Sequence, residues 1–372
     1  MNLPGYPFAA LERKAAELRA AGRAIYNFSI GDPDLPPPEY VVNAARIALN
    51  EPQAHLYPSS RGNLEVRRSV ARWFRLRFNA EVDPSDQVCI LIGAKEGLSQ
   101  IARAVVNRDD IVAVPEPAYP VYARAGCRLV EGQLRVLRLD PENGFLPDLK
   151  QAEGSRLVYL NYPNNPTGAS ATTNFLGQAA DLAESDRSLT IAYDMAYSEV
   201  YFGSSPQSLL EFTPQAVEFH SLSKMANATG YRVGFAVGEP NRIAALVRVK
   251  EEMDSGVPYP FQMALKAALD RYQTAEPPPE VKASLNVYRR RKERLTQALT
   301  ALGFRVYPSD AGFYVWFQVG TDEMDFISRA LDKGILFTPG RGFGESGKGW
   351  VRASVTVPDD VLEQAVDILG RL

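Results

Sequence analysis

The sequence predicts an α/β protein: a large domain with a mostly parallel central sheet flanked by helices, followed by a smaller α+β domain. Its 372 residues exceed what one domain of usual size requires. From about residue 87, short apolar segments alternate with helical patterns, which is typical of a parallel sheet covered by helices on both faces. After residue 280 this alternation gives way to a long helix and then to a mixture of strands and helices.

Short apolar segments are expected to form the strands of the large domain. They are QVCILI (87–92), DIVAVP (110–115), RLVYLNYP (156–163), LTIAYD (189–194), VEFHSLS (217–223) and YRVGFAVG (231–238). A helix is expected at 94–106, where the apolar residues fall on one face. In such sheets ligands bind at the carboxyl ends of the strands. Four residues of interest stand at or just past these ends: Gly93, Asn165, Asp194 and Lys224.

Two proline clusters are expected to mark the connections between domains. GDPDLPPPEYV (31–41) indicates an extended arm, and EPPPE (276–280) precedes a long helical pattern. We therefore divide the chain into an N-terminal arm (1–44) that packs with the small domain, a large domain (45–275) and a small C-terminal domain (276–372). The small domain is expected to contain a helix (281–302), a strand (312–319), a helix (323–333), two strands (335–340 and 349–355) and a closing helix (359–370).

The charge balance gives no sign of a polyanionic partner. The chain has 41 basic and 44 acidic residues, a formal net charge of −3, so neither nucleic acid nor an anionic membrane is expected as a partner. The one basic cluster, RRRKER (289–294), is interpreted as a solvated helix face. A DNA-binding regulator would also need a helix-turn-helix domain and a basic patch, and the sequence has neither.

Cysteine and histidine usage argues against disulfides and metal sites. Cys89 and Cys127 lie in apolar contexts and are expected to be free thiols in a reducing compartment. With only two histidines, no metal site is expected. The N-terminal residues lack the apolar segment of a signal peptide, and no apolar run approaches the ~20 residues that span a bilayer. A cytoplasmic protein is therefore expected.

The glycine-rich segment GFGESGKG (342–349) matches two nucleotide-binding patterns without their context. Either motif must open a helix, because the free amides at a helix N-terminus hold the phosphate. Here a strand pattern, WVRASV, follows, and residue 349 is glycine where the P-loop needs a hydroxyl. The segment is expected to be a mobile loop between two strands.

Chemically active residue types gather around Lys224, in the segment HSLSKMANATGYRVGF. Ser221 and Ser223 offer hydroxyls, and Arg232 offers a planar set of donors suited to phosphate. The turn GAKEG (93–97) opens a helix whose first amides can point at an anion. Taken singly, each feature also has an ordinary explanation, such as a surface lysine or a turn glycine.

Two more strand ends carry polar side chains. NYPNNPTG (161–168) contains Asn165, which either presents its amide to a ligand or bonds its own backbone in a turn. YDMAYSEVYF (193–202) contains Asp194 and Tyr197. Taken alone, a carboxylate at the position of Asp194 is more often a helix cap.

In order and spacing, these segments resemble the class I/II aminotransferases of the fold type I pyridoxal-phosphate enzymes. The resemblance extends from SIGDPDLPPP to GWVRAS, and its most specific parts are NNPTG, DMAYSE and SLSKMANATGYRVGF. It implies a transaminase that moves the amino group of an L-amino acid to a 2-oxo acid, with 2-oxoglutarate as one partner and ping-pong kinetics. The segments are most similar to the diaminopimelate, aspartate and alanine branch. LL-diaminopimelate or N-succinyl-diaminopimelate is the favoured donor; aspartate or alanine transamination and a β-lyase or decarboxylase remain alternatives.

The resemblance implies roles for five residues around pyridoxal 5′-phosphate. Lys224 would form the Schiff base with the cofactor aldehyde and later act as a base. Asp194 would keep the pyridine nitrogen protonated. Tyr197 and Asn165 would bond the phenolic oxygen, and Tyr119 would either stack on the ring or be an ordinary core tyrosine.

The same resemblance implies a phosphate site shared between two chains. Ser221, Arg232 and the turn at Ala94 and Lys95 would bind the phosphate. Tyr57, in LYPSSRG, matches a tyrosine that reaches the phosphate from the other subunit, which implies a homodimer with shared active sites.

For the substrate, the resemblance implies that Arg352 grips the α-carboxylate, a task for which a guanidinium is suited because it bonds a carboxylate with two donors. The backbone around Gly31 would close over the same carboxylate, beside Asn165. The residue that reads the distal end of the substrate is left open among three candidates: Arg61, Lys95 and Arg341.

Overall fold

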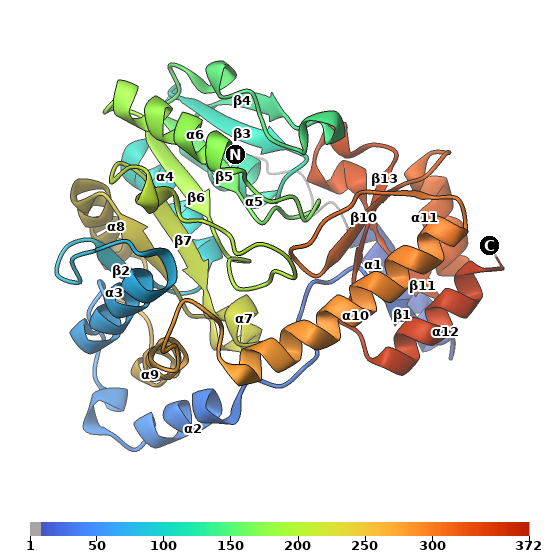
Figure 1. Cartoon of the computed structure of the whole chain (residues 1–372), viewed down its shortest axis with the longest axis horizontal. Helices are drawn as coiled ribbons and strands as arrows, with labels where there is room; N and C mark the ends of the chain where they lie inside the picture. The colour runs from blue at the N-terminus through green and yellow to red at the C-terminus, as the bar shows by residue number, and fades with distance from the viewer. Residues whose placement is uncertain (1–8, 372) are drawn as a thin grey trace.

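A seven-stranded sheet forms the centre of the large lobe in the computed structural model, which describes residues 9–371 (Figure 1). Its strands are β2 (Val88–Leu91), β3 (Ile111–Glu116), β4 (Gln133–Arg138), β5 (Leu157–Asn161), β6 (Thr190–Asp194), β7 (Val217–Ser221) and β8 (Gly234–Gly238). Their order is β2-β8-β7-β6-β5-β3-β4. The five strands from β7 to β4 are parallel, and β8 runs antiparallel to both of its neighbours. The mostly parallel sheet predicted for this lobe is confirmed.

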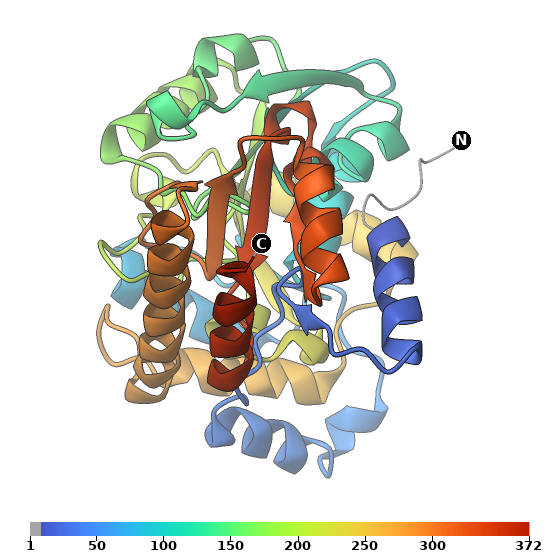
Figure 2. The same cartoon turned by 90° about the vertical axis from the view of Figure 1, so that its right-hand side faces the viewer.

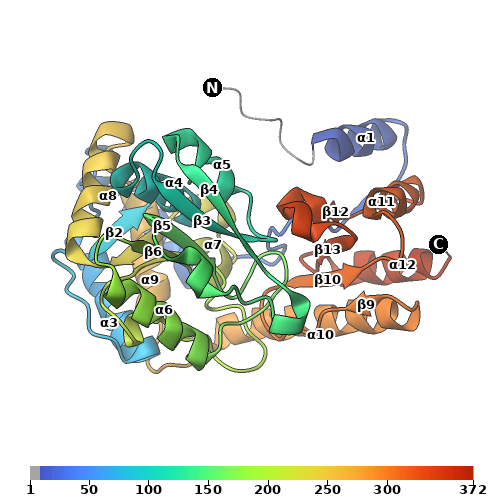
Figure 3. The same cartoon turned by 90° about the horizontal axis from the view of Figure 1, so that it is seen from above.

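Helices cover both faces of this sheet (Figure 3). On one face, apolar side chains of α4 (Ala94–Val105) and α8 (Pro240–Met253) pack with strand residues in one core cluster. On the other face, α3 (Leu64–Phe78), α6 (Thr173–Ser185) and α9 (Tyr259–Asp270) share a second cluster with the sheet. Because both faces are covered, β5, β6 and β7 are buried along their whole length, which explains their unbroken apolar sequence.

The small lobe is built on an antiparallel four-stranded sheet of order β12-β13-β10-β9. Three helices contribute to its core and lie over one face of the sheet (Figure 2). The elements are α10 (Pro279–Ala301), β9 (Arg305–Val306), β10 (Tyr314–Gln318), α11 (Glu323–Asp332), β11 (Ile335–Leu336), β12 (Thr338–Pro339), β13 (Trp350–Ser354) and α12 (Asp359–Leu369).

The N-terminal part of the chain contacts both lobes. β1 (Tyr26–Asn27) pairs in parallel with β11, and Ala15 of α1 (Ala9–Ala20) packs against Leu331 and Leu336 of the small lobe. Further along, α2 (Glu39–Ala48) lies against α9 of the large lobe. Residues 1–8 of the proposed arm fall outside the described part, and the domain bounds stay a prediction.

The interpretation of one charged segment is wrong for two of its six residues, while Arg289, Arg290 and Glu293 are exposed as expected. RRRKER was expected to be a solvated face of α10, but Arg291 and Lys292 are each only 6% exposed. Arg291 is ion-paired with Asp34 at 2.8 Å and with Asp359 at 2.5 Å. Lys292 donates three hydrogen bonds to a loop of the small lobe. Periodicity could not reveal these partners, because they come from distant parts of the chain.

Within residues 9–371, no helix is both long and apolar enough to cross a membrane. Cys89 and Cys127 are both buried and unbridged. The glycine-rich segment opens no helix longer than one turn; it forms two 3₁₀ turns, Gly340–Phe343 and Glu345–Gly347, between β12 and β13. The segment is more firmly packed than the expected mobile loop, since Ser346 donates its amide to Glu116 at 2.9 Å.

Candidate active site

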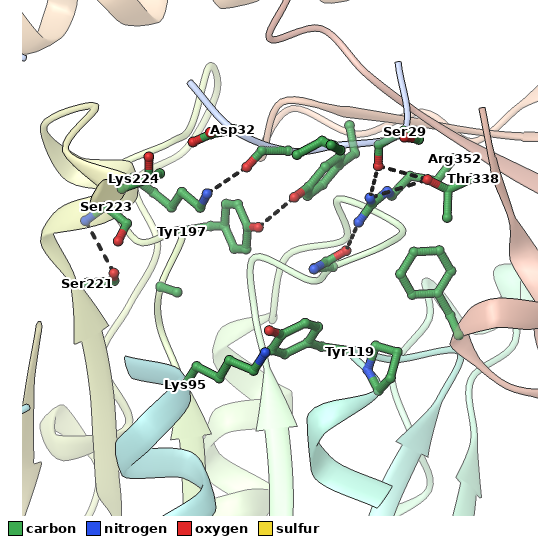
Figure 4. Close-up of a pocket in the computed structure, with 18 of the residues that line it drawn as sticks. Ser29, Asp32, Lys95, Tyr119, Tyr197, Ser221, Ser223, Lys224, Thr338 and Arg352 are labelled. Atoms are coloured by element: carbon green, nitrogen blue, oxygen red, sulfur yellow. Dashed lines mark hydrogen bonds between the residues drawn. The ribbon is translucent and has the colours of Figure 1, made fainter. Parts of the chain in front are cut away.

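A cavity of about 400 Å³ lies where the carboxyl ends of β5, β6 and β7 meet the small-lobe sheet (Figure 4). Residues from both lobes line it. As expected for residues near the carboxyl ends of parallel strands, Asn165, Asp194 and Lys224 all face this cavity, although they are far apart in the sequence. Gly93 caps the helix that follows β2, at the same edge of the sheet.

Lys224 lies on a single helical turn, α7 (Leu222–Met225), that directly follows β7. The Ser221 hydroxyl caps this turn by accepting the Ser223 amide at 3.2 Å. The Lys224 amine donates to the Gly31 carbonyl at 2.6 Å. Burial lowers the pKa of Lys224 to about 8, with Asp32 opposing the shift. A lysine held in this way supplies a neutral, nucleophilic amine much closer to neutral pH than a surface lysine does.

Asp194 ends β6 as a buried carboxylate, only 4% exposed. One oxygen accepts the Tyr122 hydroxyl at 2.6 Å, and the other accepts the Ala196 amide at 3.0 Å. Burial raises its pKa. Among the described residues it forms hydrogen bonds with neutral donors and no ion pair. A buried carboxylate of this kind is stabilised by a cationic partner, so the site fits a ligand with a protonated ring nitrogen beside Asp194.

Asn161, the last residue of β5, connects Asp194 to the asparagine turn. Its side-chain amide donates to the Asp194 carbonyl at 2.9 Å, and its side-chain oxygen accepts the Asn165 amide at 2.8 Å. Asn165 in turn accepts from Arg352 at 2.8 Å. The asparagine turn is therefore held in place from both sides, and the Asn165 side chain is already committed to Arg352.

Arg352 projects from β13 into the cavity (Figure 4). Besides Asn165 it bonds the Ser29 carbonyl at 2.6 Å, and its guanidinium lies 4.3 Å from the ring centre of Tyr314 and 4.8 Å from that of Phe343. Within the described residues its buried Nε has no hydrogen-bond partner. A stacked, fixed guanidinium with an unused donor is suited to a carboxylate ligand.

Tyr197 shares a 2.7 Å hydrogen bond with the hydroxyl of Tyr314. Burial raises the pKa of Tyr197 well above its ordinary value, and the neighbouring Tyr314 adds to this shift. The phenol therefore stays protonated throughout the physiological range, so it can donate a hydrogen bond to an oxygen in the cavity.

An anion cradle lies at the edge of the cavity. Gly93, with φ of +74°, precedes the N-terminus of α4, whose first residues Ala94 and Lys95 both line the space. A Cβ on Gly93 would stand 2.5 Å from an Arg232 nitrogen, so only glycine lets the guanidinium approach this turn. Ser221 adds a hydroxyl from the end of β7. Amides, hydroxyl and guanidinium together are the donor set that binds phosphate.

Of the two other tyrosines expected at the cofactor, one lines the cavity and the other does not. Tyr119 lines the cavity next to Tyr122, at 5.9 Å between ring centres. Tyr57 does not line it in this chain; its side chain is 94% exposed. Of the distal-group candidates, Lys95 lines the cavity, whereas Arg61 and Arg341 do not. Arg341 is paired with Asp322 and Glu323.

Several lining residues escaped sequence reasoning. Asp32 follows Gly31 in a segment of which only the backbone was expected to reach the substrate, and Tyr314 belongs to a segment recognised only as a strand. Phe343 belongs to the glycine-rich segment dismissed as a loop. Asn161 was missed because the expected strand ran to residue 163, whereas β5 ends at Asn161. Tyr122 gave no signal, because its role depends on contact with Asp194 72 residues away.

Sequence comparison relates the chain to one family over most of its length. The family model "Aminotransferase class I and II" matches residues 23–369. A protein of Aquifex aeolicus named LL-diaminopimelate aminotransferase is 42% identical over 382 aligned residues, covering 100% of this chain and 97% of the relative. A protein of the same name from Dehalococcoides mccartyi is 39% identical, covering 98% of this chain and 95% of the relative.

Solved structures show the same fold. A probable N-succinyldiaminopimelate aminotransferase from Thermus thermophilus superposes with a TM-score of 0.90 at 32% identity, covering 98% of this chain and 100% of that one. An aspartate aminotransferase double mutant from the same organism gives a TM-score of 0.92 at 27% identity, covering 100% and 97%. The fold predicted from the sequence is confirmed by both.

Proposed function

Because the chain belongs to the class I and II aminotransferases, we propose that it transfers the amino group of LL-diaminopimelate to 2-oxoglutarate with pyridoxal 5′-phosphate as its cofactor. The enzyme is a transaminase. The proposal rests chiefly on one observation: relatives named LL-diaminopimelate aminotransferase are 38–42% identical over nearly the whole chain. N-succinyl-diaminopimelate, aspartate and alanine stay alternative donors, since structures of similar fold carry the first two of these names.

The donor set of the cavity supports the choice of cofactor. When bound, pyridoxal phosphate supplies an aldehyde that an amine can bond and a ring that accepts electrons. Lys224 would hold it covalently, and the buried carboxylate of Asp194 would keep the ring nitrogen protonated. Tyr197 would donate to the phenolic oxygen, with Asn165 beside it and Tyr119 against the ring face. Once substrate has displaced it, Lys224 would move the proton at the substrate α-carbon.

The anion cradle would take the phosphate. Ala94 and Lys95 would give backbone amides, and Ser221 and Arg232 would give side-chain donors. Tyr57 would complete this site from a second copy of the chain. Its 94% exposure supports that role, as does the exposure of neighbouring apolar side chains, which would be covered in a homodimer: Ile47, Leu49 and Leu56.

Arg352 would bind the α-carboxylate of both substrates, so its replacement should weaken both half-reactions. Removing one partner of such a pair costs on the order of 2–5 kcal/mol, so Arg352→Ala should raise both Michaelis constants by roughly 30-fold or more. Arg352→Lys should recover part of this loss, because lysine keeps the charge but not the planar pair of donors. Steady-state kinetics on each substrate, beside a cofactor titration, measures this.

Cofactor affinity should hardly change in either Arg352 variant, because the phosphate donors lie elsewhere. Arg305→Lys, an exposed arginine of the same lobe, serves as the control. Weakening of one substrate alone would mean that Arg352 reads a distal group. Loss of cofactor binding with intact substrate binding would contradict the assignment of Arg352 to the substrate and of Arg232 to the cofactor phosphate.

A donor screen tests the proposed substrate. LL-diaminopimelate, N-succinyl-LL-diaminopimelate, aspartate and alanine are each offered with 2-oxoglutarate, and glutamate formation is measured. LL-diaminopimelate should give the highest kcat/KM, with parallel reciprocal plots as expected of ping-pong kinetics. A higher kcat/KM for another donor would replace the substrate proposal. Release of pyruvate and ammonia without a 2-oxo acid would instead identify a β-lyase.

A further inference from the structure

Lys292 is a buried lysine that the proposed chemistry does not use. Although it belongs to the basic run of α10, its side chain is 6% exposed. Its amine donates to the Ser309 hydroxyl at 2.8 Å and to the carbonyls of Ala311 at 2.7 Å and Gly312 at 3.1 Å. Burial lowers the pKa of Lys292 to about 7, with Asp310 opposing the shift, so the amine occupies a position that disfavours its charge. A lysine is rarely buried without a specific task for its hydrogen bonds.

The three acceptors belong to a loop, residues 309–312, that is joined to the large lobe. The Phe202 amide donates to the Asp310 carbonyl at 2.6 Å, and the Gly312 amide donates to the Val200 carbonyl at 2.7 Å. Tyr201 and Ala311 form an isolated β-bridge between these two bonds. The large-lobe partners, residues 200–202, follow Tyr197 within one short loop.

Close packing leaves the 309–312 loop little freedom on its other side. Gly168 closes the asparagine turn, and a Cβ there would stand 2.5 Å from the Ser309 hydroxyl and 2.9 Å from the Ala311 carbonyl. A Cβ on Gly203 would stand 2.0 Å from an Asp310 oxygen. The loop is thus held between the asparagine turn, residues 200–203 and the Lys292 amine.

The next two residues of this loop reach the candidate active site. The Phe313 ring centre lies 5.6 Å from the Lys224 amine and 5.5 Å from the Tyr197 ring centre. Tyr314 bonds the Tyr197 hydroxyl at 2.7 Å, and its ring lies under the Arg352 guanidinium at 4.3 Å. A shift of the loop would therefore move two aromatic rings that contact the amine, the phenol and the carboxylate-binding arginine.

We infer that Lys292 is a positioning residue for transamination: by holding the 309–312 loop through three hydrogen bonds, it fixes Phe313 against Lys224 and Tyr197, and Tyr314 against Tyr197 and Arg352, the arginine proposed to bind the substrate carboxylate. It touches neither substrate nor cofactor. The inference rests on the proposed function, because it assigns the α-carboxylate to Arg352. The phosphate donors lie on the large lobe and do not depend on this loop.

Lys292→Met tests the inference, since methionine keeps an unbranched chain of similar length but donates no hydrogen bond. In the holoenzyme, the dissociation constant for 2-oxoglutarate, measured by calorimetry, should rise about tenfold or more, and kcat/KM should fall by as much as about a hundredfold, the size of effect that a displacement of about 1 Å produces. Cofactor affinity should stay within about twofold of wild type. Arg289→Met, an exposed neighbour on the same helix, should leave all three quantities unchanged.

Ser309→Ala provides a milder second variant, because it removes one acceptor and keeps the lysine. It should weaken 2-oxoglutarate binding in the same direction but by less. A folded Lys292→Met holoenzyme that binds 2-oxoglutarate as wild type does, with only a lower melting temperature, would overturn the inference. So would an unfolded Lys292→Met protein together with unchanged binding in Ser309→Ala. If the wild type itself binds no 2-oxo acid, the proposed function fails instead.

Discussion

Lys224→Ala is expected to abolish transamination, with a loss of roughly a million-fold, the lower end of the acceleration that enzymes usually provide. The reason is that one amine would both hold the cofactor and move the proton at the substrate α-carbon. The Lys224 amine is held in the cavity by its bond to the Gly31 carbonyl at 2.6 Å. Glutamate formation over hours, at high enzyme concentration, measures the residual rate.

The Lys224→Ala protein should remain folded, since truncating this side chain leaves the core clusters intact. Circular dichroism and a melting curve check this. Lys150→Ala, which removes an exposed lysine of the same lobe, should have wild-type activity. If the Lys224 variant keeps more than a small fraction of the wild-type rate, the amine is dispensable and the proposed chemistry is wrong.

Asp194→Asn is expected to lower the rate of a single half-reaction by roughly a hundredfold to ten-thousandfold. Asparagine has the same shape: its oxygen can still accept the Ala196 amide, and its NH2 group can donate to the Tyr122 hydroxyl oxygen. It has no charge, however, with which to keep a ring nitrogen protonated. Removing one partner of a buried ion pair costs about 3–5 kcal/mol, which corresponds to that range of rates. Stopped-flow absorbance after mixing enzyme with amino donor gives the rate directly.

The same variant separates the two explanations of Asp194. If the residue were only a cap for the Ala196 amide, Asp194→Asn would turn over nearly as fast as wild type. Asp186→Asn provides the comparison, because Asp186 is a similar cap of a backbone amide, at Ser188, far from the cavity. Its rate should equal that of wild type.

The sequence predicted the strands best where both faces are covered, because continuous apolar segments then result. It missed β4, an edge strand whose residues are mostly exposed, so that no apolar segment marks it. The strand expected at 217–223 ends two residues earlier, at Ser221, because the Ser221 side chain caps the turn that carries Lys224. Capping of this kind is a local effect, but one that apolar patterning does not detect.

The candidate site was predictable where a residue stands at a strand end, and unpredictable where its role depends on a distant contact. Asp194 and Lys224 belong to the first kind. Tyr314, 117 residues beyond its partner Tyr197, belongs to the second. Lys292 was expected to be solvated for the same reason: the loop that buries it cannot be recognised from the charged run itself.

Covalent trapping of the cofactor tests directly whether Lys224 is the amine that binds it. Cofactor-free protein is mixed with pyridoxal phosphate at a series of pH values, reduced with borohydride, digested and mapped by mass spectrometry. The label should lie on the peptide containing Lys224. Its initial rate of formation should rise as pH increases through about 8, where the amine loses its proton. Labelling of another lysine in place of Lys224, or undiminished labelling of the Lys224→Ala protein, would show that a different amine binds the cofactor.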